Sequence, residues 1–178
     1  MPRVVLSGGP GVGKTTLLRQ LARRGCGVVD ESAREVIRER RVAGLSPRPD
    51  PVSFAREILA RDERKYRESP AGPGWTFFDR SAVESVGMLW ALGALPDRAL
   101  QDLLARHRFH PVVFILPPWP DIYTQDEERD HSFDHCVRVH GEVMRWYERC
   151  GYTLHELAFL DPEERADEVL DVLGRRAE

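Results

Sequence analysis

The chain has 178 residues, 42% of them hydrophobic and 31% charged, which is enough for one globular domain with a sizeable core. Its formal net charge of −3 gives no overall positive field for nucleic acid, and no apolar run is long enough to span a membrane. Three cysteines lack metal-ligand spacing and the first motif begins close to Met1, so we expect a reduced, cytoplasmic protein without a targeting segment.

The first motif along the chain is a glycine-rich loop with the spacing G-x-x-x-x-G-K-[ST], from Gly8 to Thr15. An apolar run precedes it and a helical pattern follows, which is the context that a phosphate-binding P-loop requires. Backbone N–H groups and the positive end of the helix dipole then surround a phosphate. Lys14 is the expected catalytic cation at the β- and γ-phosphates, and Thr15 the expected Mg²⁺ ligand. The nucleotide-binding residues would be Gly8, Gly9, Gly11, Val12, Gly13, Lys14, Thr15 and Thr16.

Short apolar runs alternate with helical segments along the rest of the chain, which predicts an α/β fold with a parallel sheet in one domain over residues 1–178. The expected strands are Arg3–Ser7, Gly27–Asp30, Trp75–Phe78, Pro111–Leu116 and Tyr152–Leu157. The expected helices follow the P-loop to about Arg24 and then cover about Ser32–Arg41, Asp50–Arg67, Ser81–Leu92, Pro96–His107, Asp130–Cys150 and Asp161–Gly174. Two of them begin with a capping-box pattern, at Ser32 and at Ser81.

Charged residues follow the second and third strands, at the sheet edge where doubly wound folds place their sites. Asp79 could ligate Mg²⁺ or take a proton from an acceptor hydroxyl, or it could only complement a helix dipole. Arg80 could contact a substrate, or it could pair with Glu31 or Glu84. Glu31 and Arg34 could bind the acceptor, or form one surface ion pair.

The segment after the fourth strand combines prolines, aromatic residues and a charge cluster, and we expect a flap at about residues 117–130. A cationic Arg129 on such a flap could stabilise charge in the transition state, although a solvated charge run is the alternative. Trp119 and Tyr123 could stack on a ligand, but anchoring the segment on the core is the favoured interpretation.

Several of these motifs together resemble a group of P-loop proteins called AAA family ATPases, which includes the kinase domain of bacterial ribosylnicotinamide kinase. The resemblance covers nearly the whole chain. It rests on Gly8–Thr16, Glu31-x-x-Arg34, Phe78-Asp79-Arg80-Ser81, Leu116-Pro117-Pro118-Trp119 with Tyr123, Asp126-x-x-Arg129 and Gly151-Tyr152.

What this resemblance implies is a nucleoside- or nucleotide-kinase fold. Its sheet would have the strand order 2-3-1-4-5, with helices on both faces in a three-layer sandwich. It also implies a catalytic carboxylate at Asp79 and a flap arginine at Arg129. The Asp79-Arg80-Ser81 run is similar to motifs of deoxyribonucleoside and thymidylate kinases, in which the acidic residue lies at the acceptor and the arginine lies near phosphate.

The function predicted from these features is transfer of a phosphoryl group from Mg²⁺-bound ATP to a hydroxyl of a small, nucleoside-like metabolite. Substrate contacts would come from Glu31, Arg34 and Arg80, and the metal ligands would be Thr15 and Asp79. The alternative is a nucleotide-binding regulatory ATPase or adaptor, since an animal relative in the group binds GTP and phosphoinositides. A Ras-like GTPase is disfavoured, because the chain contains no Asn for the guanine-binding motif.

Overall fold

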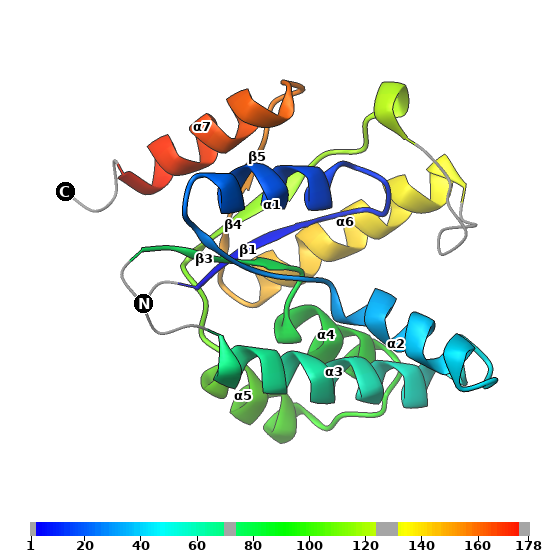
Figure 1. Cartoon of the computed structure of the whole chain (residues 1–178). Helices are drawn as coiled ribbons and strands as arrows, with labels where there is room; N and C mark the ends of the chain where they lie inside the picture. The colour runs from blue at the N-terminus through cyan, green and yellow to red at the C-terminus, as the bar shows by residue number, and fades with distance from the viewer. Residues whose placement is uncertain (1–2, 70–73, 124–131, 175–178) are drawn as a thin grey trace.

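The fold is a three-layer α/β sandwich built on one parallel sheet (Figure 1), seen in a computed structural model that describes residues 3–69, 74–123 and 132–174. Five strands form this sheet in the predicted order β2-β3-β1-β4-β5: β1 Arg3–Gly8, β2 Gly27–Val29, β3 Thr76–Asp79, β4 Val112–Leu116 and β5 Thr153–Glu156. The helices are α1 Lys14–Arg23, α2 Ser32–Val42, α3 Pro51–Glu68, α4 Ala82–Ala91, α5 Asp97–Arg106, α6 Phe133–Arg149 and α7 Pro162–Gly174, with a 3-10 turn η1 at Pro120–Ile122.

The two faces of the sheet are covered by different helices, as Figure 1 shows. In the central strand, Val4 and Leu6 pack into the apolar layer of α1 and α7. Val5 points to the opposite face, where α6 supplies Val143 and Tyr147. All five side chains are buried. The continuous apolar runs of these strands therefore reflect burial of the sheet on both faces.

A third apolar cluster joins α3, α4 and α5 outside the sheet. It holds α3 against α4, so that the side chains of these two helices reach the same edge of the sheet as the P-loop. The strand register completes that edge, since Leu6 of β1 is paired with Asp79 of β3, and Gly8 is paired with Leu116 of β4. This packing brings residues from three distant parts of the sequence around one loop.

Two helix starts follow the sequence prediction and one does not. Asp50 caps α3 by accepting a hydrogen bond from Ser53 N at 3.0 Å, and Ser81 caps α4 by accepting one from Val83 N at 3.2 Å. The capping box predicted at Ser32 is wrong, because Ser32 lies inside α2 and Glu31 is the N-cap residue. The Glu35 carboxylate, which should have closed that box, instead pairs with basic residues of α3.

No helix in the part of the chain that the structure describes combines the length and the apolar character needed to cross a bilayer.

Candidate active site

The P-loop connects β1 to α1 and closes around the side chain of Lys14. Lys14 Nζ donates to the carbonyl oxygens of Gly9 at 2.7 Å and Gly8 at 3.5 Å, and the residue is only 3% exposed. Burial, together with the nearby charge of Arg80, lowers the Lys14 pKa. A cation held by these carbonyl oxygens can exchange the contacts for phosphate oxygens of an incoming nucleotide.

Two glycines of the loop are required by close packing. A Cβ on Gly8 would lie 2.4 Å from the carbonyl oxygen of Leu116, and one on Gly9 would lie 2.5 Å from Cys136 Sγ and 2.6 Å from the Cys136 carbonyl oxygen. Gly8 also has a φ of +137°. The loop therefore keeps its shape only if these positions lack side chains, which agrees with their predicted role.

Asp79 ends β3 beside the loop and is 5% exposed. Its Oδ2 accepts a hydrogen bond from Thr15 Oγ1 at 3.4 Å, while its Oδ1 is buried without a hydrogen-bond partner among the described residues. Burial raises the Asp79 pKa to about 6, although the charge of Lys14 opposes the rise. A hydroxyl and a carboxylate with an unsatisfied oxygen are hard ligands of the kind that Mg²⁺ takes from a protein, so the residues fit that ion.

Arg80 follows Asp79 with a φ of +66°, the one positive φ of a non-glycine residue in the described ranges. Its N–H donates to the Leu6 carbonyl oxygen, and this strained turn sends the side chain back under the P-loop. The guanidinium group donates to the Gly8 carbonyl oxygen at 2.9 Å and pairs with Glu84 at 2.6 Å and Glu31 at 3.3 Å. Burial opposes the charge of Arg80, but these carboxylates outweigh it and raise the pKa of Arg80.

Glu31 and Arg34 form the ion pair that their spacing allows, with 3.3 Å between Arg34 Nε and Glu31 Oε2. Glu31 is shared between Arg34 and Arg80, and although burial opposes its charge, Arg80 and the other cations lower its pKa. Glu31 and Arg34 also line the pocket described next. The structure therefore confirms the ion pair, whereas acceptor binding by Glu31 and Arg34 stays a prediction.

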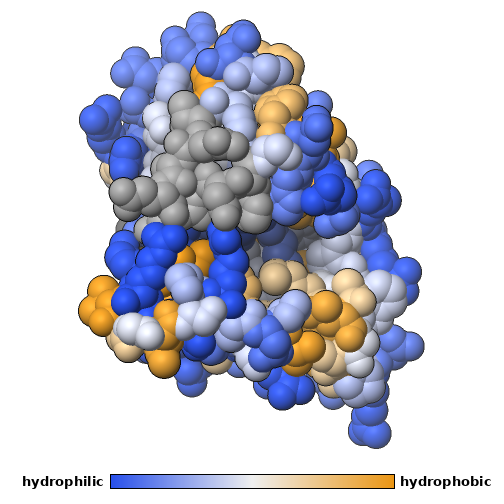
Figure 2. Space-filling view, turned by 90° about the vertical axis from the view of Figure 1, so that its right-hand side faces the viewer, coloured by the Kyte–Doolittle hydropathy of each residue, from blue (hydrophilic) through white to orange (hydrophobic). Residues whose placement is uncertain are grey.

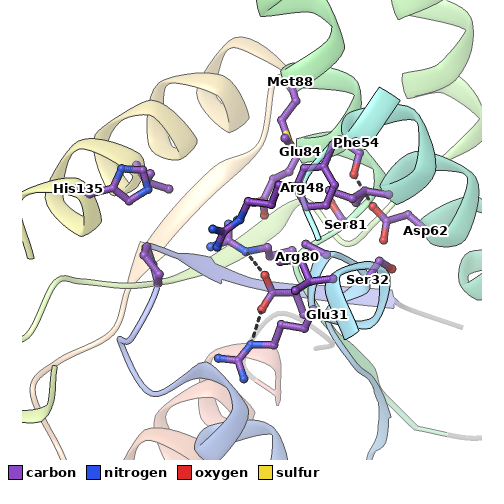
Figure 3. A pocket seen from close by; sticks show the side chains of 17 residues that line it. Glu31, Ser32, Arg48, Phe54, Asp62, Arg80, Ser81, Glu84, Met88 and His135 are labelled. Carbon is purple, nitrogen blue, oxygen red and sulfur yellow. Dashed lines mark hydrogen bonds and ion pairs between the residues drawn. The ribbon is translucent and has the colours of Figure 1, made fainter. Parts of the chain in front are cut away.

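A pocket of about 260 Å³ borders the P-loop at Pro10 and extends between α2, α3, α4 and α6. Figure 2 shows the hollow on this face of the molecule, and Figure 3 shows its lining, with Asp62 and His135 on opposite sides of Arg80 and Glu31. The lining is apolar around a few charged groups: Pro10, Glu31, Ser32, Ala33, Arg34, Ile37, Arg48, Phe54, Ile58, Asp62, Arg80, Ser81, Glu84, Ser85, Met88, His135 and Val139. We call it the Arg80 pocket.

A second pocket, of about 440 Å³, borders the same loop along the first turn of α1 and reaches Trp119, η1 and the start of α7. Its lining includes Lys14 and Thr15. Arg165 of α7 closes it, with its guanidinium carbon 4.9 Å from the centre of the Trp119 ring and its Nη1 3.4 Å from the Val12 carbonyl oxygen. Arg165 is 3% exposed, and its Nη2 has no hydrogen-bond partner in the part of the chain that the structure describes. We call this the Trp119 pocket.

The structure thus brings together most of the predicted site residues. Thr15 and Lys14 lie with Asp79, and Glu31, Arg34 and Arg80 form one charged network beside them. Val12 lies in the loop and Thr16 lies in the first turn of α1, as expected. Arg129 lies outside the described residues, as does half of the expected flap (124–130), so their predicted roles stay predictions.

Three further residues at the site were not predicted to act there: Glu84, Asp62 and Arg165. Glu84 had been considered only as a partner of Arg80 or in a cap, but its Oε1 also accepts hydrogen bonds from Ser7 Oγ and Tyr147 Oη. Asp62 interrupts the apolar stripe of α3, four residues after Ile58, and Arg165 lies on the buried face of α7. A charged residue at an otherwise apolar helix position was the signal that could have found both.

Solved structures share this fold at low sequence identity. Deoxyadenosine kinase from M. mycoides with bound dATP has a TM-score of 0.66 at 12% identity, over 98% of this chain and 100% of that one. Shikimate kinase from Acinetobacter baumannii in complex with shikimate has a TM-score of 0.64 at 15% identity, over 99% of this chain and 94% of that one. NadR protein in complex with NR has a TM-score of 0.70 at 21% identity, over 98% of this chain and 51% of that one. The chain therefore spans about half of NadR.

At the level of sequence, the comparison with curated proteins finds no match. The profile of the family described as an AAA domain matches residues 3–165, which is most of the chain and includes the P-loop, Asp79, Arg80 and the first residues of α7. The chain therefore belongs to this AAA-domain family, and its fold is that of the P-loop kinases.

Proposed function

We propose that the protein is an ATP-dependent kinase that transfers the γ-phosphoryl group to a hydroxyl of a small, nucleoside-like metabolite. The observation that carries the proposal is that two separate pockets border one P-loop. The Trp119 pocket contains Lys14 and Thr15, whereas the Arg80 pocket begins at Pro10 and contains the arginine next to Asp79. A nucleotide-binding switch needs only a pocket for the nucleotide. A phosphotransferase needs one pocket for the donor and another for the acceptor, both next to the P-loop.

The donor would bind with its phosphates in the P-loop and its base in the Trp119 pocket. Lys14 would exchange its contacts with the Gly8 and Gly9 carbonyl oxygens for the β- and γ-phosphates. Trp119 and Arg165 offer flat surfaces on which a nucleobase can stack. Thr15 and Asp79 would hold Mg²⁺, which supplies charge neutralisation at the phosphates when it is bound.

The acceptor would lie in the Arg80 pocket with its hydroxyl toward the P-loop. The new bond forms between the acceptor oxygen and the γ-phosphorus as the bond to the β–γ bridging oxygen breaks, and ADP leaves. Asp79 can take the hydroxyl proton, or it can orient the site as a metal ligand. Arg80 is held by two carboxylates and a backbone carbonyl, so its charge is fixed near the transferring group before the substrates arrive.

The kinds of protein that share the fold support this choice of reaction. Two of the solved structures described above are kinases of small metabolites, one a deoxyadenosine kinase and one a shikimate kinase. Their different acceptors agree with a common donor site and a variable acceptor pocket. For this chain, the acceptor class depends on the residues of its own Arg80 pocket.

The experiment is an acceptor screen with the purified chain, Mg²⁺ and ATP, in which each product is detected by the added mass of one phosphoryl group. We expect a nucleoside or related hydroxyl compound to be phosphorylated, and the rate to fall by about 100-fold or more in Lys14→Met. Lys65→Met is the matched control, because Lys65 is the other lysine of the chain and pairs with Glu35 outside the pocket lining. Release of inorganic phosphate at one rate with every acceptor would instead support an ATPase.

A further inference from the structure

The Arg80 pocket has a far end that the phosphoryl-transfer mechanism does not use. Asp62 of α3 and Ser85 of α4 meet there, with Ser85 Oγ donating to Asp62 Oδ2 at 2.5 Å. The apolar side chains of Phe54, Ile58 and Met88 line the same pocket as this polar pair. Figure 3 shows Asp62 on the side of the pocket away from His135, and the Ser32 hydroxyl lies near the Asp62 carboxylate. A flat or apolar group that enters this end would therefore meet one carboxylate among apolar walls.

Asp62 differs from the other acidic residues of the pocket in having no cation as a partner. Glu31 pairs with Arg34 and Arg80, and Glu84 pairs with Arg80, whereas Asp62 forms no ion pair with the described basic residues. Burial raises the Asp62 pKa to about 6, although the neighbouring hydroxyls of Ser32 and Ser85 and the charge of Lys65 oppose the rise. A carboxylate in such a place gains most from a ligand that donates hydrogen bonds to it.

The charges of the pocket also indicate whether the acceptor carries a phosphate group. Three acidic and three basic side chains line it: Glu31, Asp62 and Glu84 with Arg34, Arg48 and Arg80. Arg80 and Arg34 already have carboxylate partners, at 2.6 Å and 3.3 Å. A phosphate group that binds to Arg80 or Arg34 would have to displace these partners. The balance therefore favours an acceptor that is uncharged or weakly cationic.

We infer that Asp62 determines acceptor specificity. It selects nucleoside-like acceptors whose ring carries an N–H donor, such as an exocyclic amino or carboxamide group. Analogues without this donor and phosphorylated acceptors bind more weakly. The inference rests on the proposed function for the orientation of the acceptor, since the hydroxyl end must face the P-loop. The ring end then lies against Phe54 and Ile58, with its donor on Asp62. Ser85 holds the carboxylate in place for that contact.

The test uses pairs of nucleosides in which an amino or carboxamide group of the ring is replaced by hydrogen, such as adenosine and purine riboside, and includes adenosine monophosphate. Binding to the purified full chain is measured by calorimetry without ATP, and phosphorylation is measured separately with Mg²⁺ and ATP. In at least one pair we expect the donor-bearing member to bind about 10-fold or more tightly than its partner, and adenosine to bind more tightly than its monophosphate.

Asp62→Asn should reduce that discrimination to about threefold or less, because an amide in place of the carboxylate presents its own N–H groups. Glu63→Gln is the matched control on the same helix, since Glu63 lies outside the pocket lining, and it should leave the discrimination unchanged. The inference is overturned if no pair is discriminated, or if Asp62→Asn discriminates as the wild type does. Discriminating binding without any phosphorylation would overturn the proposed function alone, and phosphorylation without discrimination would overturn this inference alone.

Discussion

Replacing Asp62 by asparagine should stabilise the folded protein at neutral and alkaline pH. Burial and the charge of Glu84 raise the Asp62 pKa from an ordinary 3.8 to about 6. Between these two values the folded state keeps a proton that the unfolded chain has lost, so the free energy of unfolding falls as the pH rises through this window. Asparagine has nearly the same shape, carries no charge, and can still accept the hydrogen bond from Ser85 Oγ.

The size of the effect follows from the shift in pKa and from the exposure of the side chain. At about 1.36 kcal/mol for each pKa unit, a rise from 3.8 to about 6 in a fully buried group costs the folded state about 3 kcal/mol above pH 7. Asp62 is only partly buried, because it borders an open pocket, so solvent screens its charge. We therefore expect Asp62→Asn to gain about 1–2 kcal/mol at about pH 8 and little at about pH 4.

Urea unfolding of the wild type and the variant at a series of pH values measures this difference. Asp50→Ala is a control of opposite sign, because Asp50 caps α3 through Ser53 N and its pKa is lowered by that contact. Its loss should destabilise the protein, more so above about pH 4 than below it. The reasoning is refuted if Asp62→Asn is no more stable than the wild type at about pH 8, or if the difference does not grow with pH.

Three further predictions concern the P-loop and its neighbours. Asp79→Asn should lower the rate of phosphoryl transfer by about 100-fold or more, because it removes the carboxylate that holds Mg²⁺ or takes the hydroxyl proton; initial rates at saturating ATP and Mg²⁺ check this, and an unchanged rate would contradict it. Gly9→Ala should weaken ATP binding and lower the midpoint of unfolding, since its Cβ would lie 2.5 Å from Cys136 Sγ. Gly174→Ala should do neither, because a Cβ at Gly174 would meet open space. Equal effects of the two substitutions would contradict this expectation. Trp119→Ala should raise the Kd for ATP about fivefold and leave acceptor binding unchanged, if the base stacks in the Trp119 pocket; calorimetry with each ligand separates the two.

The fold and the donor half of the site could be predicted because their signals are local. The P-loop has fixed spacing between a strand and a helix, and parallel strands collect their carboxyl ends at one edge, which placed Asp79 and Arg80 next to that loop. The strand order came from the resemblance to a known group, since strand lengths and periodicity do not encode it. The structure confirms that order.

The rest of the site depends on packing between elements that are distant in sequence. The ion pairs of Arg80 with Glu31 and Glu84 were among the predicted alternatives, but the left-handed backbone that sends the Arg80 side chain under the P-loop has no sign in the sequence. Asp62 reaches the Arg80 pocket only because the third apolar cluster holds α3 against α4. The capping box at Ser32 failed for a related reason, since Glu31 and Glu35 are used by arginine and lysine partners on other elements.

The central claim, transfer of the γ-phosphoryl group to an acceptor hydroxyl, is tested most directly by following the fate of that group by phosphorus NMR. The acceptor identified in the screen is incubated with the full chain, Mg²⁺ and ATP, and the signals of ADP, phosphorylated acceptor and inorganic phosphate are followed together. We predict that phosphorylated acceptor and ADP accumulate in equal amounts, and that both depend on Lys14. Equal amounts of ADP and inorganic phosphate, with no phosphorylated acceptor, would contradict the account.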